Sequence, residues 1–303
     1  MTTRKGILLA GGSGTRLFPL TKAVSKHLLQ LWDKPIIYYP LSVLMLAGIR
    51  EIAIITTPED QSQFQRLLGD GSALGITIDW IVQPSPDGLA QAYILAEDFL
   101  DGQPSAMILG DNVHYGHGLW QLLSAANEQT SGGTVFCFQV SDPQRYGIIT
   151  FDENGEPLSI EEKPAQPKSN FALTGLYFFD ARAPAWAKEI SVSARGELEI
   201  TALIEKYLDH GELTIESMGR GFTWLDTGTK DGLVEAGEFI RVIEKRQGLK
   251  VGCPEEVAFR MGFIDRNQLS SIADPISSTS YGRYLHELAA DDNVFSGTPV
   301  VED

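Results

Sequence analysis

The stretch Lys5-Gly-Ile-Leu-Leu-Ala-Gly-Gly-Ser-Gly-Thr-Arg16 decides the fold of this chain. Its apolar run, residues 7–10, is typical of a short buried strand, and three glycines within the next four positions end that strand. Glycine tolerates positive φ and close approach, so successive backbone N–H groups can converge on an anion. Arg16 and, further on, Lys26 place positive charge beside the turn. We therefore expect a strand followed by a loop that binds a phosphate group.

The glycine turn is not specific by itself. It lacks the Gly-Lys-Ser/Thr of a P-loop, and no third glycine follows Gly12 and Gly14 to complete the dinucleotide-binding spacing. An ordinary connection between a strand and a helix explains such a turn equally well. The rest of the chain has to discriminate between these two interpretations.

The composition is that of a soluble globular protein, with 43% hydrophobic and 21% charged residues in a chain of 303. No apolar run approaches the ~20 residues of a membrane span, and the N-terminal run is shorter than the ~7–15 residues of a signal-peptide core. A net charge of −16 argues against nucleic acid and anionic membrane as partners. Cys137 and Cys253 are too few for a disulfide framework or a zinc site and fit a reducing compartment. We therefore expect a cytoplasmic protein without nucleic-acid or membrane partners.

Strand and helix patterns alternate through the first 140 residues. Expected strands lie at 51–56, 76–82, 106–109 and 134–140, and expected helices at 36–47, 58–68, 89–100 and 119–127. Alternation with short connections predicts an α/β, Rossmann-like fold with a mostly parallel central sheet flanked by helices. Ligands bind such sheets at the carboxyl ends of the strands, where both the glycine turn and Asp111 are expected.

After Tyr146 the pattern changes. We expect a hairpin at 147–156 with a turn at Asn154-Gly155, strands at 159–162, 172–180 and 222–225, a helix at 199–210, and a long helix with its apolar stripe at 233–243. Three short helical pieces and a polar tail, residues 291–303, follow Gly248. The chain thus divides into a catalytic body with an added small β region, residues 1–247, and a C-terminal helical annex and tail, residues 248–303.

Two aspartates, Asp111 and Asp226, each follow an apolar strand. A pair of carboxylates beside a phosphate site suits Mg²⁺, which prefers oxygen ligands. The alternative, which spacing alone favours, is that each aspartate caps the next helix. Lys163 and Arg195 lie in charged loops that a solvated surface would also explain. The five histidines show no metal-binding spacing, and no Gly-x-Ser-x-Gly elbow is present, so nucleophilic serine or cysteine chemistry has no support.

Taken in order, these motifs resemble the sugar-1-phosphate nucleotidylyltransferases, and within them the glucose-1-phosphate thymidylyltransferases. The segments that carry the resemblance are residues 9–17, 25–26, 33–41, 83–92, 109–112, 145–147, 161–164, 195–201 and 224–229. It extends from residue 4 to about residue 290, and several motifs in a fixed order are far more specific than one loop.

The resemblance implies that α-D-glucose-1-phosphate attacks the α-phosphorus of dTTP in line, with Mg²⁺ as cofactor, giving dTDP-glucose and pyrophosphate. This would be the first step toward dTDP-deoxysugars such as dTDP-rhamnose. A phosphate monoester has its second pKa at ~6 and is largely a dianion at neutral pH, so it needs no general base. Two alternatives remain: an enzyme that uses UTP, CTP or ATP or another sugar phosphate, and a non-catalytic homologue that binds nucleotide sugar.

The resemblance also implies residue roles. Catalytic roles fall on Arg16, Lys26, Asp111, Lys163 and Asp226, with Asp111 and Asp226 as the Mg²⁺ ligands. Nucleotide binding falls on Leu9, Gly11, Gly12, Gly14, Thr15, Arg16, Lys26, Gln83, Gly88 and Asp111. Sugar-phosphate binding falls on Asn112, Tyr146, Gly147, Glu162, Lys163, Leu173, Tyr177 and Arg195. Arg16 should neutralise the leaving pyrophosphate, and the Gln83 amide suits a pyrimidine edge.

The chain departs from the family at His27, where relatives often have Gln, and at Ala202, where they commonly have Asp. Relatives of this length usually form homotetramers with a second, inhibitory nucleotide-sugar site near the annex. The residues that resemble this regulatory site are Tyr115, Gly116, Gly219, Val251, Glu256 and Arg260. Alternatively, Glu256 and Arg260 form an i,i+4 pair on a helix surface.

Overall fold

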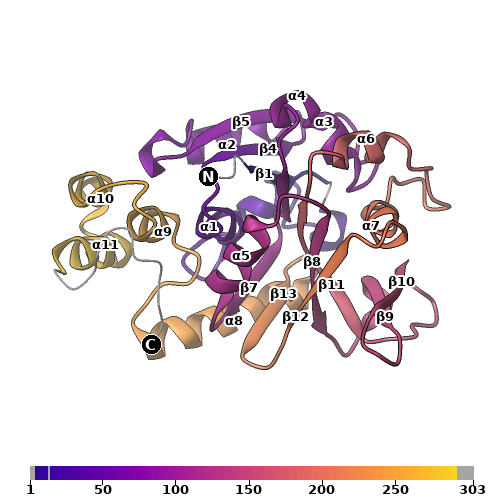
Figure 1. Ribbon diagram of the computed structural model, residues 1–303. Helices are drawn as coiled ribbons and strands as arrows, with labels where there is room; N and C mark the ends of the chain where they lie inside the picture. The colour runs from indigo at the N-terminus through magenta and orange to yellow at the C-terminus, as the bar shows by residue number, and fades with distance from the viewer. Residues whose placement is uncertain (1–3, 13, 292–303) are drawn as a thin grey trace.

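A computed structural model describes residues 4–12 and 14–291 and shows a large twisted sheet with helices on both faces (Figure 1). Its first part is parallel: β5 (Thr77–Val82), β4 (Glu51–Thr56), β1 (Lys5–Ala10) and β6 (Ser105–Leu109) lie side by side in that order. The expected α/β class with a mostly parallel central sheet is confirmed.

An antiparallel strand, β11 (Phe171–Phe179), joins the parallel part to the rest of the sheet. It pairs with β8 (Gly133–Gln139) along one side, and along the other with β6 through residues 176–179 and with β9 (Gly147–Phe151) through residues 171–172. On its free side, strand β8 pairs in parallel with β12 (Leu213–Met218). Strand β9 forms the expected hairpin with β10 (Pro157–Glu162). The small β region is therefore an extension of the same sheet.

The two faces of the sheet carry separate hydrophobic clusters because alternate strand residues point to opposite sides. On β1, Leu8 and Ala10 pack with α1 (Tyr38–Leu46) and α5 (Leu119–Glu128). Ile7 and Leu9 pack on the other side with α3 (Gln91–Leu95), α6 (Ala183–Lys188) and α7 (Ile200–Asp209). Residues 7–10 are almost completely buried, as their apolar run predicted.

Several expected elements differ in detail. The helix expected at 58–68 begins at Gln61 as α2 (Gln61–Leu68), and the helix expected at 89–100 is divided into α3 and α4 (Glu97–Leu100). Strand β7 (Asn112–Gly116), together with β12 and α6, was not expected. Strand β7 pairs with β13 (Phe222–Asp226) in a separate two-stranded sheet, and this pairing brings residues 111 and 226 together.

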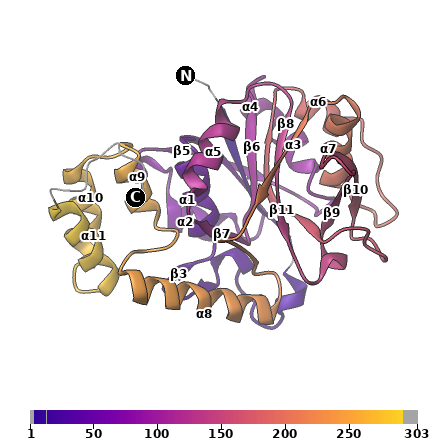
Figure 2. The same cartoon turned by 60° about the horizontal axis from the view of Figure 1, so that its bottom comes forward.

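The C-terminal annex consists of α9 (Pro254–Arg260), α10 (Arg266–Ala273) and α11 (Ser280–Ala290). The long helix α8 (Lys230–Gln247) runs along one edge of the molecule toward it (Figure 2). A short hairpin, β2 (Gln30–Leu31) with β3 (Lys34–Pro35), lies against α8. The polar tail after Asp291 lies outside the described residues. No helix in the described part of the chain is both long enough and apolar enough to span a membrane.

Candidate active site

The glycine turn opens at the carboxyl end of β1 and requires glycine at specific positions. Gly12 and Gly14 have φ of +96° and +58°, in the left-handed region. A Cβ on Gly11 would lie 2.3 Å from Oε1 of Gln83, so the missing side chain makes room for the Gln83 amide. The Gln83 amide is held in turn, because its Nε2 donates to Oε1 of Gln91 over 2.7 Å.

Asp111 lies between β6 and β7, with only 8% of its surface exposed. Lys26 Nζ donates to its Oδ2 over 2.5 Å. Burial alone would raise the pKa of Asp111, but Lys26 and, to a smaller extent, His27 lower this pKa to about 2. Asp111 is therefore ionised at neutral pH.

Asp226 ends β13, opposite Asn112 in the pairing with β7. Its Oδ2 accepts a hydrogen bond from Arg145 Nη2 over 3.2 Å, and its Oδ1 accepts one from the backbone N–H of Gly228 over 2.9 Å. Burial and the neighbouring Asp111 raise the pKa of Asp226. The two carboxylates thus repel each other across a partly closed space.

Neither aspartate caps a helix, so that alternative is wrong. Asp111 is followed directly by β7, because the chain pairs with β13 there instead of entering a helix. The N-cap of α8 is Thr229, whose Oγ1 accepts a hydrogen bond from Gly232 N over 3.1 Å. Both carboxylates remain available to a ligand.

The aspartate pair has the donor chemistry for a divalent cation. Two neighbouring carboxylates, one buried and one half-buried, repel each other and gain from a positive charge between them, and oxygen donors suit Mg²⁺. Within residues 4–12 and 14–291 no cluster of three or more His, Cys, Asp or Glu has metal-binding geometry. A cation held here would therefore take its remaining ligands from water and from a substrate, as Mg²⁺ commonly does.

Opposite the glycine turn, charged side chains already form ion pairs. Glu162 Oε1 lies 3.2 Å from Lys163 Nζ and 3.3 Å from Arg195 Nη1. The same Arg195 nitrogen lies 3.3 Å from Oε1 of Glu199. Lys163 has φ +44°, a strained backbone for a residue with a side chain and one that functional sites often tolerate. We call Gly11, Gly12, Arg16, Lys26, Gln83 and Gly88 the glycine wall, and Glu162, Lys163, Arg195 and Glu199 the ion-pair wall.

The two walls enclose one cavity of about 540 Å³, which also contains the aspartate pair. The expected site residues that line it are Leu9, Gly11, Gly12, Arg16, Lys26, Gln83, Gly88, Asp111, Asn112, Tyr146, Gly147, Glu162, Lys163, Leu173, Tyr177, Arg195 and Asp226. Gly14 and Thr15 do not line it and belong to the turn beneath. Arg16 reaches toward Asp226: a Cβ on Gly228 would lie 2.8 Å from its Nη2 and 2.9 Å from Oδ1 of Asp226.

The structure adds lining residues for which sequence reasoning assigned no role. They include Arg145, Trp224, Gly175, Glu199 and Thr201. Trp224 donates from Nε1 to Oδ1 of Asn112 over 2.6 Å, and its ring meets Tyr146 edge-on at 4.9 Å. The motifs containing Arg145 and Trp224 had been noted. The pairing of β7 with β13 brings Trp224 to the cavity, where Arg145, from the turn before β9, bonds to Asp226.

His27 lines the same cavity with 1% of its surface exposed. Burial and the adjacent Lys26 lower its pKa to about 3, so the ring is neutral. Nδ1 is hydrogen-bonded to Ser25 Oγ at 3.1 Å. The departure from the family at this position therefore exchanges one uncharged polar group for another. Ala202, the second departure, lies on α7 and does not line the cavity.

Gly88 is needed first for packing between the walls. With φ +118°, it lies so close to Leu198 that a Cβ would meet that residue's backbone oxygen at 2.3 Å. The N–H of Ala90 donates to Leu198 O, and Leu198 N–H donates to Asp87 O. The loop before α3 is thus joined to the loop before α7, which carries Arg195.

The residues that resemble a regulatory site lie outside the cavity, namely Tyr115, Gly116, Gly219, Val251, Glu256 and Arg260. Arg260 Nε donates to Glu256 Oε1 over 2.8 Å, which is the i,i+4 pair of the alternative interpretation. Glu256 also accepts a hydrogen bond from Tyr284 over 2.5 Å. Tyr115 donates to Gln247 at the end of α8.

Comparison with known proteins agrees with this geometry. The model of the family described as "Nucleotidyl transferase" matches residues 5–242. The glucose-1-phosphate thymidylyltransferase of Xanthomonas campestris pv. campestris is 57% identical over 289 residues, which are 95% of this chain and 98% of that protein. Those of Neisseria gonorrhoeae (94% of this chain, 99% of that protein) and Mycobacterium tuberculosis (94% and 98%) are 55% and 51% identical over 284 residues.

Solved structures show the same similarity. A putative glucose-1-phosphate thymidylyltransferase from Bacillus anthracis, in complex with a sucrose, has a TM-score of 0.73 and 38% identity, and the match covers 78% of this chain and 95% of that one. A UDP-glucose pyrophosphorylase complexed with UDP-glucose has a TM-score of 0.70 at 24% identity, over 82% of this chain and 100% of that one. The second match concerns the fold alone.

Proposed function

Because the chain belongs to the glucose-1-phosphate thymidylyltransferases, within the nucleotidyl transferase family, we propose that it converts dTTP and α-D-glucose-1-phosphate into dTDP-glucose and pyrophosphate. One observation carries the residue assignment. A single cavity brings a glycine wall, a pair of neighbouring carboxylates and an ion-pair wall together. This is the arrangement that a reaction between two phosphate compounds requires.

The sugar phosphate acts as nucleophile without a base, because its phosphate is already largely a dianion at neutral pH. Lys163 and Arg195 bind this phosphate, and Glu162 accepts hydrogen bonds from sugar hydroxyls. The ion pairs between them hold the three side chains in place before the substrate arrives. Catalysis is then a matter of position and charge, as in phosphoryl transfer generally.

On the other wall, the glycine turn and Gln83 bind the nucleotide. Gln83 presents an amide beside Gly11 and Gly88, so it can donate to and accept from a pyrimidine edge. Arg16 and Lys26 neutralise the triphosphate and the departing pyrophosphate. Arg16 is well placed for this role because its guanidinium extends over Gly228 beside Asp226.

A divalent cation, Mg²⁺ in our proposal, is held by Asp111 and Asp226 and supplies charge neutralisation on phosphoryl oxygens. The support is the closeness of the two carboxylates: after burial, the charge of Asp111 is the next largest cause of the raised pKa of Asp226. Addition of a chelator in excess over Mg²⁺ should abolish turnover, and restored Mg²⁺ should recover it. The control is the far-UV circular dichroism spectrum, which the chelator should leave unchanged.

The decisive experiment incubates the protein with glucose-1-phosphate, Mg²⁺ and each of dTTP, UTP, CTP and ATP, and follows pyrophosphate release. We expect fastest release with dTTP. Preference for UTP would contradict the thymidylyl assignment alone, whereas no release with any nucleotide would favour the non-catalytic homologue. The variants Asp111→Asn and Asp226→Asn should each lose activity by about 10²–10⁴-fold with the fold intact. Normal turnover of both would contradict the metal assignment.

Three further properties implied by the resemblance stay predictions: a cytoplasmic location, a homotetramer and an inhibitory nucleotide-sugar site. Light scattering coupled to size-exclusion chromatography measures the mass of the assembly and so tests the homotetramer. Titration with dTDP-rhamnose tests the third, and initial rates that do not change would exclude it.

A further inference from the structure

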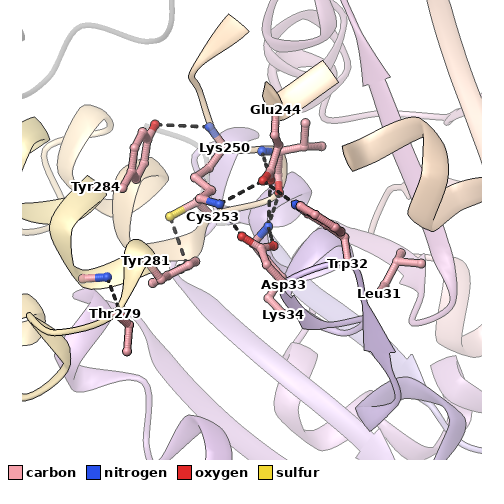
Figure 3. A network of polar contacts seen from close by, with 12 residues as sticks. Leu31, Trp32, Asp33, Lys34, Glu244, Lys250, Cys253, Thr279, Tyr281 and Tyr284 are labelled. Carbon is pink, nitrogen blue, oxygen red and sulfur yellow. Dashed lines mark hydrogen bonds and ion pairs between the residues drawn. The ribbon is translucent and has the colours of Figure 1, made fainter. Parts of the chain in front are cut away.

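A cluster of four charged residues, of which Lys34 and Glu244 are buried, lies at the C-terminal end of α8 (Figure 3). Its centre is Glu244, only 7% exposed. The carboxylate of Glu244 accepts four hydrogen bonds, from Trp32 Nε1 (3.0 Å), Lys34 Nζ (3.0 Å), Lys250 Nζ (2.9 Å) and the backbone N–H of Val251 (3.0 Å). It therefore fastens the β2–β3 hairpin and the segment after α8 to the same helix end.

The cluster is electrically balanced. Asp33 pairs with Lys34 at 2.5 Å and also with Lys250, so two cations meet two carboxylates. Burial alone would raise the pKa of Asp33, but the two lysines lower it. Lys34 also donates to the backbone oxygen of Val251 over 3.0 Å and has only 4% of its surface exposed. Such buried pairs add little stability compared with apolar contacts, but their directional bonds can fix one register between elements.

The two segments that meet in this cluster lead directly into the proposed active site. Helix α8 has 18 residues, roughly 27 Å of rigid helix, and its N-cap Thr229 follows Asp226 by three positions. The hairpin is joined back toward Lys26 by backbone bonds from Ile37 N to His27 O (2.9 Å) and from Ile36 N to Leu29 O (3.1 Å). The cluster therefore joins the far ends of two segments, α8 and the β2–β3 hairpin, whose near ends lead to Asp226 and Lys26 in the cavity. We call this closed path the loop.

Apolar contacts fill the middle of that loop. Leu31 of the hairpin packs with Ala236 and Ile240 of α8 and with Val251. These contacts bring the elements together, but they are non-directional and tolerate a small slide of the helix along the hairpin. The bonds to Glu244 do not tolerate it, because a shift of about 1 Å would break their geometry.

We propose that Lys34 and Glu244 are positioning residues, whose buried ion pair sets the place of Lys26 relative to Asp226 across the cavity. This inference rests on the proposed roles of Lys26 and Asp226. A misplacement of about 1 Å at reacting groups can cost on the order of 10² in rate, even when its cause is remote.

The test removes the buried ion pair between the hairpin and α8 and leaves the other contacts of the cluster in place. Lys34→Met removes the cation, while Glu244 keeps Lys250, Trp32 and Val251 as partners. We expect kcat to fall about 10–100-fold and the Mg²⁺ concentration for half-maximal rate to rise. The KM for glucose-1-phosphate should stay within about twofold, because Lys163 and Arg195 lie outside the loop that the cluster closes. This split is the readout, since partial unfolding lowers the apparent kcat without raising the Mg²⁺ requirement.

Tyr281→Phe is the matched control, with both variants assayed well below their melting temperatures. The Tyr281 hydroxyl donates to the buried Glu255 over 2.6 Å within the annex, and the ring, which faces Lys250 Nζ at 5.8 Å, is kept in the Phe variant. We expect this control to lose stability and to keep its kcat. A Lys34→Met enzyme with normal kcat, or with a loss that equals its unfolded fraction, would overturn the inference.

Two further variants keep the test decisive. If Lys34→Met does not fold, Trp32→Phe removes one hydrogen bond to Glu244 and keeps a ring, and its kcat should fall about threefold. An unchanged kcat there overturns the inference as well. Asp226→Asn is measured in parallel: an active Asp226→Asn enzyme contradicts the proposed function, whereas an inactive one beside a normal Lys34→Met enzyme contradicts the positioning role alone.

Discussion

The two walls of the cavity recognise charge in different ways. The glycine wall offers backbone, one amide and two cations, of which Arg16 lies beside Asp226 and Lys26 is paired with Asp111. The ion-pair wall offers Lys163 and Arg195, which are already paired with carboxylates. Preformed pairs pre-orient long side chains and lower the entropy lost on binding. The ion-pair wall is therefore suited to fix the position of the sugar phosphate. The glycine wall is suited to stabilise the negative charge that develops on the departing pyrophosphate.

Arg16→Ala should separate these roles most strongly. The variant removes a cation from the glycine wall that acts on the leaving group, so kcat should fall about 10²–10³-fold. The KM for glucose-1-phosphate should remain nearly unchanged, because no residue of the ion-pair wall is altered. Steady-state kinetics with each substrate varied in turn measure both values, and a rise in that KM of similar size would contradict the division of roles.

Arg195→Ala should act in the opposite way. Loss of one hydrogen bond between charged groups should raise the KM for the sugar phosphate about tenfold or more, with a smaller change in kcat. The matched control is Lys188→Ala, which breaks an exposed ion pair with Glu97 on α4 and should leave all constants unchanged. A pure loss of kcat in Arg195→Ala would argue for a role in the transfer step instead.

Gly88→Ala tests the junction between the walls. The new Cβ would collide with the backbone of Leu198 at a φ of +118°, so the loops before α3 and α7 must separate. We expect a loss of about 1–3 kcal/mol in the free energy of unfolding and a higher KM for both substrates. Denaturant unfolding gives the first value, and an effect on the nucleotide alone would show that the junction is not shared.

Thr229→Ala should have the smallest effect. It removes the hydroxyl that accepts from Gly232 N at the start of α8 and should cost about 1 kcal/mol in the free energy of unfolding. Because Asp226 keeps its own bond from Gly228 N, kcat should change less than threefold. A large loss of kcat would mean that the cap, and not only the strand pairing, positions Asp226.

The sequence was sufficient to predict the parallel half of the fold. Residues 51–56 form a strand with the expected bounds, because a run of this length rich in β-branched residues favours a strand over a helix. The prediction of one helix at 89–100 was only partly correct, since the helix is interrupted at Ala96. Hydrophobic periodicity does not reveal such a break. Strand β12 is only half-buried, which gives a weak pattern.

At the site, the local sequence was sufficient to predict the glycine turn, but it was not sufficient to decide whether the aspartates cap helices or face a ligand. Whether Asp111 caps a helix or faces a ligand depends on β7 pairing with β13, over one hundred residues away. Spacing favoured the wrong alternative because it contains no information on long-range pairing. The same pairing brings Trp224 to Asn112, which explains why that contact was missed.

Strand β11 has a consequence for anyone who redesigns this enzyme. It is hydrogen-bonded to β6, which leads into Asp111, and it carries Leu173 and Tyr177 into the cavity. An insertion or deletion in β11 would therefore disturb the binding of both substrates at once, whereas a side-chain exchange at Leu173 would leave the ladder intact. Libraries aimed at new sugars should vary the identity of residues along this strand and keep its length fixed.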